Sequence, residues 1–401
     1  MKKLSLATRI FIGLVLGVLT GLLLQSSPEV ATTYIKPLGN LFLNLIKMII
    51  VPLVLSSLVV GSASTGDVGK LGRIGIKTLI YYLVTTALAV ILGLFLANLI
   101  NPGHGLSIPL DSTAEAREAP SIVETLLNIV PTNPIQAMAE ANMLQIIFFA
   151  LFLGIGITLV GDKAKPLLSF FDSLAEVSYK IVAIIMAFAP IGVFGLIAPV
   201  VAEHGASALL PLLKVIIAVY IACFLHAVFV YSAAVYFSAK MSPVTFFKGA
   251  APAMMVAFTT SSSSGTLPIT MKCAEENLGV PKSISSFVLP LGATINMDGT
   301  ALYQGVCALF VAQVYGIELS IAQQLTVVLT ATLASIGTAG VPGSGLIMLT
   351  MVLQSIGLPL EGMVLVGGID RILDMARTCI NITGDMAGAI IVSATEGELS
   401  L

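Results

Sequence analysis

The sequence predicts an all-helical protein that crosses a membrane several times, and three observations support this prediction. Hydrophobic residues make up 57% of the 401 residues, and charged residues only 10%. Soluble domains carry about a quarter charged residues, so a chain this apolar cannot keep its whole surface in water. Apolar segments of spanning length follow one another, and two later ones are interrupted by polar, glycine-rich stretches.

Six apolar segments are long enough to span a bilayer, for which about 20 residues suffice. They cover residues 10–24, 41–60, 78–100, 144–160, 177–201 and 210–239. The first resembles a signal peptide, but it runs to Gln25 without a small-residue cleavage site. Lys2, Lys3 and Arg9 precede it, and the positive-inside bias therefore predicts a cytoplasmic amino end.

The part of the chain between the third and fourth segments is less regular. Residues 101–120 are polar and contain proline and glycine, which indicates a loop. Residues 121–143 are of mixed character and are broken by Pro131 and Pro134, which predicts short, interrupted helices.

Two apolar segments in the second half of the chain are each interrupted near the middle by a polar, glycine-containing stretch. Residues 246–272 are interrupted at 259–265, and residues 325–356 are interrupted at 335–343. Non-helical backbone at membrane depth is tolerated only where protein buries it or where it lines a wet cavity. Such paired interruptions point to a transporter's binding site. We therefore predict two re-entrant helical hairpins whose tips meet near the midplane; the alternative is that small residues allow close helix packing.

The last apolar segment, residues 364–392, contains a row of polar groups. They are Asp370, Arg371, Asp374, Arg377, Asn381 and Asp385. At about 100° per residue, all but Arg371 fall within an arc of about 80° on one helix face. Ionisable groups within a membrane are costly and usually functional. A structural ion-pair ladder would explain Asp370 with Arg371, but it would not explain why Asn381 and Asp385 extend the row.

Residues 292–300 interrupt another apolar region and carry Thr294, Asn296 and Asp298. We predict that a span unwinds here and exposes carbonyl, amide and carboxylate oxygens, which are the ligands that hard cations prefer. The alternative is a glycine hinge with a hydrogen-bonded buried aspartate, which would be costly because no cationic residue lies nearby in the sequence.

Other sites are disfavoured by the sequence. The cysteines lie in or beside apolar stretches without CxxC pairing, and we expect small buried side chains at Cys223, Cys273, Cys307 and Cys379. No metal site is expected at His104, His204 or His226, because they are far apart and none pairs with an acidic residue at ligand spacing. The serine run Ser261–Ser264 could suggest the nucleophile of an intramembrane serine protease. This alternative is disfavoured, because no histidine is placed to act as an oriented base. A serine-rich tip at a helix end instead suits a carboxylate.

Four motifs resemble one known family. They read SSSSGTLPIT, PLGATINMDGTALYQG, ASIGTAGVPGSG and DRILDMARTCINITGD, and they are preceded by YYLVTT in the third segment and by NPG after it. In this order they resemble the dicarboxylate/amino acid:cation symporters, which include the glutamate-transporter homologues of bacteria and archaea. The resemblance is close from about residue 243 to the end.

The resemblance implies an all-α polytopic fold of eight transmembrane helices and two re-entrant hairpins, assembled as a homotrimer. Each protomer would work as an elevator, without enzyme activity. Residues 1–70 and 106–205 would form the scaffold, and residues 71–105 and 206–401 the sliding transport domain. The expected location is a prokaryotic inner membrane, with both termini in the cytoplasm. The protein is expected to contact the lipid bilayer and not to bind nucleic acid.

The resemblance also assigns a substrate site. Its residues are Ser261, Ser263, Thr300, Val341, Gly345, Asp374, Arg377, Thr378 and Asn381. In this assignment, Arg377 pairs with the substrate's side-chain carboxylate, because its guanidinium can bind such a group with two hydrogen bonds. Asp374 receives the ammonium group. The first hairpin tip and Asn381 bind the α-carboxylate, while Val341 and Gly345 close over the substrate.

Sodium ions are the implied coupling ions, and three sites match the family. The first comprises Gly292, Asn296, Asn381 and Asp385; the second comprises Thr294 with the carbonyls of Ser335, Ile336 and Thr338; the third comprises Tyr82, Thr85, Thr86, Asn296 and Asp298. Because Asn296 serves two sites, one ion would organise backbone that the next ion and the substrate need.

Several positions narrow the expected function. Arg377 favours an acidic substrate, and Asp374 favours an amino acid over a C4-dicarboxylate. Gln304 occupies a position where proton- and potassium-coupled relatives carry glutamate, and Asp385 is retained, which together favour sodium. Arg371 is expected near Asp374 or Asp370, where it would tune substrate release. A proton-coupled or C4-dicarboxylate symporter and a passive channel stay open as alternatives, and aspartate is not distinguished from glutamate because they differ by one methylene.

Overall fold

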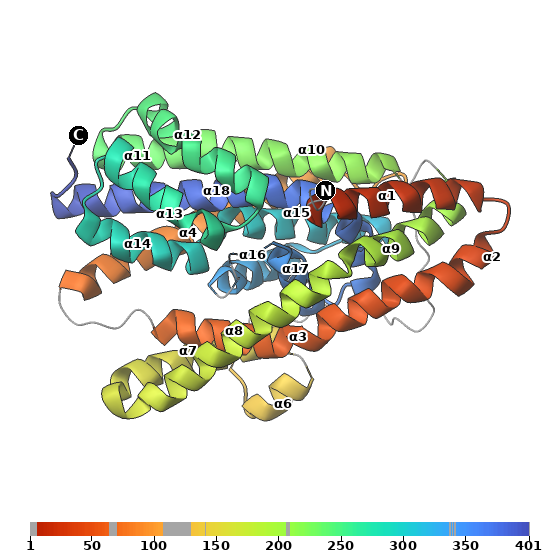
Figure 1. Ribbon diagram of the computed structural model, residues 1–401, viewed down its shortest axis with the longest axis horizontal. Helices are drawn as coiled ribbons and strands as arrows, with labels where there is room; N and C mark the ends of the chain where they lie inside the picture. The colour runs from red at the N-terminus through yellow and green to blue at the C-terminus, as the bar shows by residue number, and fades with distance from the viewer. Residues whose placement is uncertain are drawn as a thin grey trace, which may run out of the picture.

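The structure is a computed structural model. It describes residues 6–63, 70–106, 130–140, 142–205, 209–336, 338, 340 and 342–400. Within these residues every regular element is a helix, as the sequence predicts, and long helices lie roughly along one direction (Figure 1).

Glycines on one face of the first helix bring it close to a later one. α1 (Leu6–Leu23) packs along α9 (Ala189–His204), and Gly13, Gly17 and Gly21 line the contact. A Cβ atom at Gly21 would lie 2.6 Å from a carbonyl oxygen of α9. Glycines four residues apart let two apolar helices approach without a conventional hydrophobic driving force.

A second pair of helices packs against α3 (Lys36–Ala63), namely α7 (Met143–Val160) and α8 (Lys165–Ala187). The segment predicted as one span over residues 177–201 is divided at Phe188, because α8 ends at Ala187 and α9 starts at Ala189. Pro190 lies in the first turn of α9. Backbone N–H groups there have no acceptor within the helix, so the missing N–H of proline costs no hydrogen bond. Short elements complete this part: α2 (Pro28–Val30), η1 (Ala31–Ile35), α6 (Pro134–Ala139) and η2 (Gly161–Ala164).

The longest helix, α18 (Met363–Glu396), lies at the centre of the remaining helices (Figure 1). It contacts α4 (Lys70–Ile100), α10 (Leu209–Leu225), α14 (Lys282–Ile295) and α15 (Asp298–Val314). Most of α15 is buried, including the polar residues Asp298, Thr300 and Gln304 near its start. The polar row of α18 is therefore enclosed by protein. Two further elements prolong α10: η4 (His226–Tyr231) and α11 (Ser232–Ala239).

Both interrupted segments form helical hairpins, which confirms that part of the prediction. The first consists of α12 (Pro243–Thr260) and α13 (Ser263–Lys272), and the second of α16 (Ile321–Ser335) and α17 (Ser344–Ser355). Ser261 ends α12 in the left-handed region with φ +53°, and the Ser262 side chain caps α13 by accepting from the Gly265 N–H. The remaining short elements are η5 (Cys273–Asn277) and η6 (Leu360–Gly362).

The two hairpin tips touch each other, as expected. The Ser262 hydroxyl donates to the carbonyl of Gly340 over 2.8 Å, and the Ser264 N–H donates to the same oxygen over 3.1 Å. Polar tips that satisfy one another can lie inside a protein without a large desolvation cost.

The unwound stretch predicted over residues 292–300 is much shorter in the structure. Only Asn296 and Met297 separate α14 from α15, and Asn296 is extended with φ −92° and ψ 96°. Helical hydrogen bonding continues up to this point, since the Asn296 N–H still donates to the Gly292 carbonyl. These two non-helical residues suffice to turn side chains toward α18.

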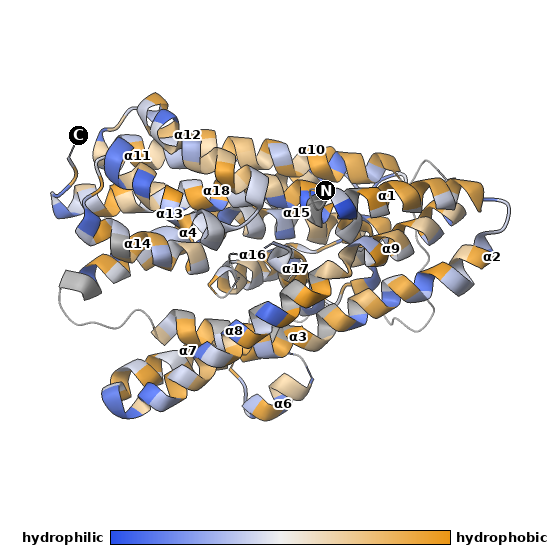
Figure 2. Ribbon diagram, in the orientation of Figure 1, coloured by the Kyte–Doolittle hydropathy of each residue, from blue (hydrophilic) through white to orange (hydrophobic). Residues whose placement is uncertain are grey.

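Two helical stretches are long and apolar enough to cross a membrane by length and composition: Arg73–Ile100, and Leu209–Ala239, which comprises α10, η4 and α11. Among the residues that the structure describes, apolar helical stretches of 10–17 residues also occur, for example Ala189–Glu203 and Ile321–Ser335. Hydrophobic residues dominate α1, α9 and α10 (Figure 2). On α4, large hydrophobic side chains at Ile76, Ile80 and Val84 are exposed along one face, which suits contact with lipid.

A charge cluster joins the end of α18 to the start of α4. Glu396 accepts from Arg73 over 2.6 Å and from Lys77 over 2.7 Å. These hydrogen bonds, that from Arg73 first, lower the pKa of Glu396 from 4.5 to about 2. A lowered native pKa means that the ionised group stabilises the fold above about pH 4.5, and that this contribution is lost as the pH falls toward 2.

We therefore expect Glu396→Gln to lower Tm by a few degrees at pH 7, with a difference from the unmodified protein that shrinks below about pH 4.5. Melting curves of detergent-solubilised protein across this pH range measure the effect. Glu361→Gln, at a surface position of η6, is the matched control. A Tm difference independent of pH would contradict the ionic origin.

Candidate functional site

The site centres on a fully buried guanidinium group. Arg377 Nη1 lies 2.8 Å from Asp370 Oδ1, Nη2 lies 2.8 Å from Asp374 Oδ1, and the guanidinium carbon is 4.0 Å from the ring centre of Tyr303. Asp370 thus pairs with Arg377 and not with Arg371, the partner that a structural ion-pair ladder would give it. Residues seven apart share a helix face, whereas adjacent residues point about 100° apart. Arg377 is thus held by two carboxylates and an aromatic face.

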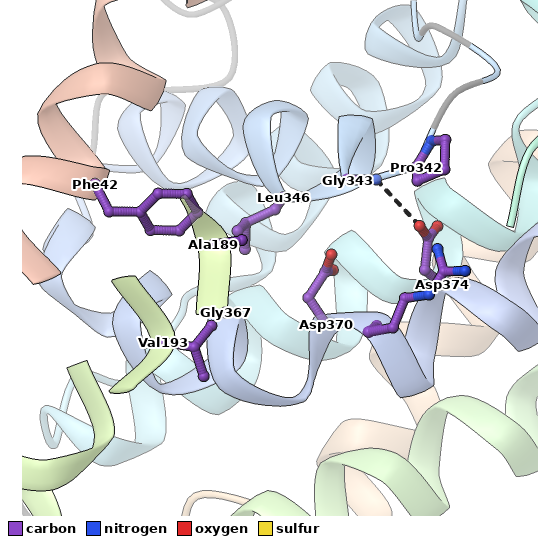
Figure 3. A pocket seen from close by; sticks show the side chains of 10 residues that line it. Phe42, Ala189, Val193, Pro342, Gly343, Leu346, Gly367, Asp370 and Asp374 are labelled. Carbon is purple, nitrogen blue, oxygen red and sulfur yellow. Dashed lines mark hydrogen bonds between the residues drawn. The ribbon is translucent and has the colours of Figure 1, made fainter. Parts of the chain in front are cut away.

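The second hairpin covers this arginine. The Gly343 N–H donates to Asp374 Oδ2 over 3.1 Å, as Figure 3 shows, and a Cβ atom at Gly345 would lie 3.0 Å from the guanidinium carbon. Gly345 thus leaves no room for a side chain between hairpin and guanidinium. Val341, also assigned to the substrate site, lies outside the described residues.

A narrow pocket opens beside these carboxylates (Figure 3). Its lining comes from both halves of the chain: Phe42, Ala189, Val193, Pro342, Gly343, Leu346, Gly367, Asp370, Arg371 and Asp374. One wall is apolar and belongs to α3 and α9. The opposite wall carries the charges of α18 and the tip of the second hairpin, so a polar molecule would meet the carboxylates there.

Arg371 does not pair with Asp370 or Asp374, which corrects the expectation from the sequence. Its Nη2 atom donates to the carbonyl of Thr260 over 3.3 Å and lies 3.5 Å from that of Thr259. These carbonyls belong to the last turn of α12, where a helix presents unsatisfied acceptors and a partial negative charge. Arg371 therefore ties α18 to the first hairpin.

Asn381 organises the next turn of the row. Its side-chain oxygen accepts from the Gly299 N–H over 2.8 Å, and its nitrogen donates to Thr300 Oγ1 over 3.3 Å and contacts Met297 Sδ. Of the other substrate-site residues, Ser261, Ser263 and Thr378 are buried, and the Ser261 hydroxyl has no hydrogen-bond partner among the described residues. The structure gathers Thr300, Asp374, Arg377 and Asn381 around one region.

Asn296 joins two further groups of α18. Its Nδ2 atom donates to Asp385 Oδ1 over 2.9 Å and to the Asn381 carbonyl over 3.1 Å. A Cβ atom at Gly292 would lie 2.5 Å from Asp385 Oδ1, so this glycine leaves the carboxylate room. Asn296 Oδ1 is buried and has no hydrogen-bond partner in the part of the chain that the structure describes. Buried acceptors are almost always satisfied, and an unpaired amide oxygen beside a carboxylate fits a cation ligand. The four residues assigned to the first sodium site are thus brought together.

The buried carboxylate of Asp298 has three neighbours. Thr86 Oγ1 donates to Oδ1 over 2.6 Å, Tyr231 donates to Oδ2 over 2.7 Å, and His226 Nε2 lies 3.3 Å from Oδ2. This pair could not be recognised from spacing, because no histidine lies at ligand spacing from an acidic residue along the chain. His226 and Asp298 are 72 positions apart, and only the tertiary packing, which sets η4 beside α4 and α18, makes them neighbours.

Two other residues of the third sodium site donate hydrogen bonds to backbone carbonyls of helices. The Tyr82 hydroxyl donates to the Val288 carbonyl over 3.1 Å, and Thr85 Oγ1 donates to carbonyls one turn back on α4. Thr86 and Asp298 are the pair that this structure joins directly.

The second sodium site is the least assembled. Thr294 is exposed and donates to Leu291, while the hydroxyls of Ser335 and Thr338 bond within their own hairpin. Among the described residues no hydrogen bond links Thr294 to that hairpin. The end of α14 nevertheless adjoins the tip, since a Cβ atom at Gly340 would lie 2.8 Å from the Ala293 carbonyl.

Three residues of this region were not predicted from the sequence: His226, Tyr231 and Tyr303. Each is a polar or aromatic side chain in an otherwise apolar stretch, which was the available signal. The cysteines are unpaired, and three are buried as predicted, whereas Cys379 is only partly buried.

Helical hairpins that interrupt an apolar bundle around a buried row of charges are typical of secondary transporters. The comparisons identify the particular group. The chain belongs to the sodium:dicarboxylate symporter family, whose model matches residues 6–395. The chain is therefore a membrane transporter, and its helical structure is consistent with this class.

Three relatives illustrate the range of this family. A proton/sodium-glutamate symport protein of Geobacillus stearothermophilus is 43% identical over 99% of this chain and 96% of its own. A proton/glutamate-aspartate symporter of Escherichia coli (strain K12) is 41% identical over 98% and 93%. A C4-dicarboxylate transport protein of Bacillus subtilis (strain 168) is 36% identical over 98% and 94%.

Proposed function

We propose that this protein is a secondary active symporter that imports L-aspartate or L-glutamate together with sodium ions. The observation that carries the proposal is the buried triplet of Asp370, Arg377 and Asp374. An acidic amino acid offers a carboxylate to Arg377 and an ammonium group to Asp374. It can therefore replace the Arg377–Asp374 pair by two new pairs without leaving a buried charge alone, which would be costly.

This exchange also discriminates against other substrates. A C4-dicarboxylate would pair with Arg377 but would leave Asp374 unpaired beside a second carboxylate. A neutral amino acid would satisfy Asp374 but would compete poorly for Arg377. A substrate that leaves a buried polar group of the site unpaired is rejected strongly, whereas a substrate that differs by one methylene is rejected only weakly. The Gly343 N–H on Asp374 then provides a route by which substrate binding reaches the second hairpin.

Sodium would bind at the oxygen clusters around α14 and α15. We assign one ion to Gly292, Asn296, Asn381 and Asp385, and another to Tyr82, Thr85, Thr86, Asn296 and Asp298. Thr294 with Ser335, Ile336 and Thr338 would form the last site once the second hairpin closes. Since Asn296 bonds both Asp385 and the Asn381 carbonyl, an ion there would order the residues that receive substrate.

The proposed movement is that of an elevator. The scaffold comprises residues 1–70 and 106–205, and the transport domain comprises residues 71–105 and 206–401. The pocket supports this division, because Phe42, Ala189 and Val193 lie on its scaffold wall and Asp370 and Asp374 on its transport wall. We further propose a homotrimer with eight spanning helices and two re-entrant hairpins, in a prokaryotic inner membrane with cytoplasmic termini, without enzymatic activity.

Proton-coupled transport on the same fold is a second candidate function, because the names of two relatives describe proton symport, in one case together with sodium. Gln304, which cannot titrate, and the retained carboxylate of Asp385 favour sodium. C4-dicarboxylate transport, named for the Bacillus relative, is disfavoured by Asp374.

Uptake of labelled L-aspartate into proteoliposomes tests the proposal. The external buffer contains sodium or choline at matched pH, and unlabelled glutamate and succinate serve as competitors. We expect accumulation only with sodium, competition by glutamate and none by succinate. Equal uptake in choline would reject sodium coupling, and competition by succinate would reject the role of Asp374. Flux without accumulation would indicate a passive channel.

The contact of Arg371 with the first hairpin predicts a kinetic role. Arg371→Ala removes a donor from two carbonyls at the end of α12 but leaves the pairs of Arg377 intact. We expect the rate of L-aspartate exchange to change by about three- to tenfold, with an apparent affinity within about threefold, because exposed charged hydrogen bonds contribute about 1 kcal/mol. Exchange kinetics in proteoliposomes measure both quantities. Unchanged rate and affinity would exclude this role.

A further inference from the structure

The residues that clamp Asp298 lie on an unusual turn. η4 is a π-helical stretch, and at its end the Ser232 N–H donates to the Ala227 carbonyl five residues earlier. In an α-helix, residues five apart point about 140° away from each other. A π-turn carries one extra residue and brings positions i and i+5 to the same side. His226 and Tyr231 are such a pair.

Both side chains therefore reach one carboxylate oxygen. Tyr231 Oη is 2.7 Å from Asp298 Oδ2, His226 Nε2 is 3.3 Å from it, and the two rings meet edge to face at 4.8 Å. Asp298, His226 and Tyr231 are each fully buried. With its proton on Nε2, the imidazole donates to Asp298, and its Nδ1 atom has no partner among the described residues.

The other carboxylate oxygen faces a different group. Asp298 Oδ1 accepts from Thr86 Oγ1 of α4, and Thr86 belongs to the proposed third sodium site. The donors of η4 thus occupy one oxygen and leave the other directed toward the cation ligands of α4. Tyr231 Oη also lies 3.2 Å from the Ile380 carbonyl, which places the clamp against α18.

We propose that His226 and Tyr231 are positioning residues for sodium binding, which act by fixing Asp298 so that Oδ1 alone faces the ion. This inference rests on the proposed sodium symport. A carboxylate fixed in place binds a small cation without a reorganisation cost, and an oxygen at a set distance distinguishes sodium from smaller lithium. A carboxylate free to turn would bind sodium less tightly and would accommodate lithium relatively better.

Substrate-free thermal stabilisation by ions tests this without relying on transport. Tm of the purified protein is measured against sodium or lithium concentration, with choline keeping ionic strength constant. In Tyr231→Phe and in His226→Leu we expect the half-saturating sodium concentration to rise about tenfold and the sodium-over-lithium preference to fall. His226→Gln keeps a donor and should stay within about threefold of the unmodified protein.

Tyr236→Phe is the matched control, because Tyr236 lies on α11 with an exposed side chain. A purely structural role would lower Tm in choline without moving the half-saturating sodium concentration or the ion preference, and that result would overturn the proposal. Lack of sodium-specific stabilisation in the unmodified protein would instead overturn sodium coupling, and the positioning role with it. Tyr231→Phe removes a single oxygen, so a folding failure of His226→Leu leaves the test intact.

Discussion

Replacing Arg377 by alanine is expected to weaken L-aspartate binding about a thousandfold, because removing one partner of a buried, hydrogen-bonded charge pair costs about 2–5 kcal/mol. The guanidinium group is fully buried between Asp370, Asp374 and the Tyr303 ring. No other cation in the described part of the chain pairs with these two carboxylates. Competition against labelled L-aspartate uptake in proteoliposomes measures the apparent affinity.

The Arg377→Ala variant also leaves two carboxylates without their partner, which would destabilise the protein by about 3–5 kcal/mol. The double variant Asp370→Asn/Arg377→Ala removes one of these charges and should recover part of the lost Tm without recovering L-aspartate binding. Arg9→Ala, at an exposed position of α1, controls for the loss of an arginine. Retained L-aspartate affinity in a folded Arg377→Ala variant would show that the substrate carboxylate binds elsewhere.

Asp385→Asn is expected to raise the half-saturating sodium concentration about ten- to hundredfold, because loss of a charged ligand costs about 1.5–3 kcal/mol. The carboxylate adjoins Gly292 and accepts from Asn296. Asparagine has the same shape and can still accept through its amide oxygen, so the packing of α14 against α18 is kept. Sodium-dependent uptake at saturating L-aspartate measures the shift.

Asp172→Asn, at an exposed position of α8, is the control for loss of an aspartate. In Asp385→Asn the affinity for L-aspartate at a fixed, subsaturating sodium concentration should fall as well, because ion and substrate binding are coupled through Asn296 and Asn381. Sodium dependence equal to that of the unmodified protein would remove Asp385 from the set of ligands.

Much of the site could be predicted from sequence because its main element is one helix. Asp370, Asp374, Arg377, Asn381 and Asp385 share a face of α18 by helical periodicity alone, and the structure keeps them buried together. The hairpins were predictable for a similar reason, since serine and glycine runs cannot continue an apolar span. Local rules were sufficient for both.

Pairing choices could not be predicted in the same way. The partner of Asp370 is Arg377 rather than adjacent Arg371, and Arg371 reaches carbonyls more than 110 positions away. Two further features were not predicted from the sequence. They are the break between α8 and α9 and the short length of the unwound stretch at Asn296. The hydrogen bonds of Arg371 in particular depend on a segment that is distant along the chain.

The sequence alone determined the membrane class, the two hairpins and the polar face of α18, because burial in lipid and helical periodicity act on local residue patterns. The contacts of His226 and Tyr231 with Asp298, and of Gly343 with Asp374, follow instead from the packing of helices that are distant in sequence. The physical reason is that a buried carboxylate takes its donors from whichever helices pack around it. That packing is set by the whole bundle and not by spacing along one helix.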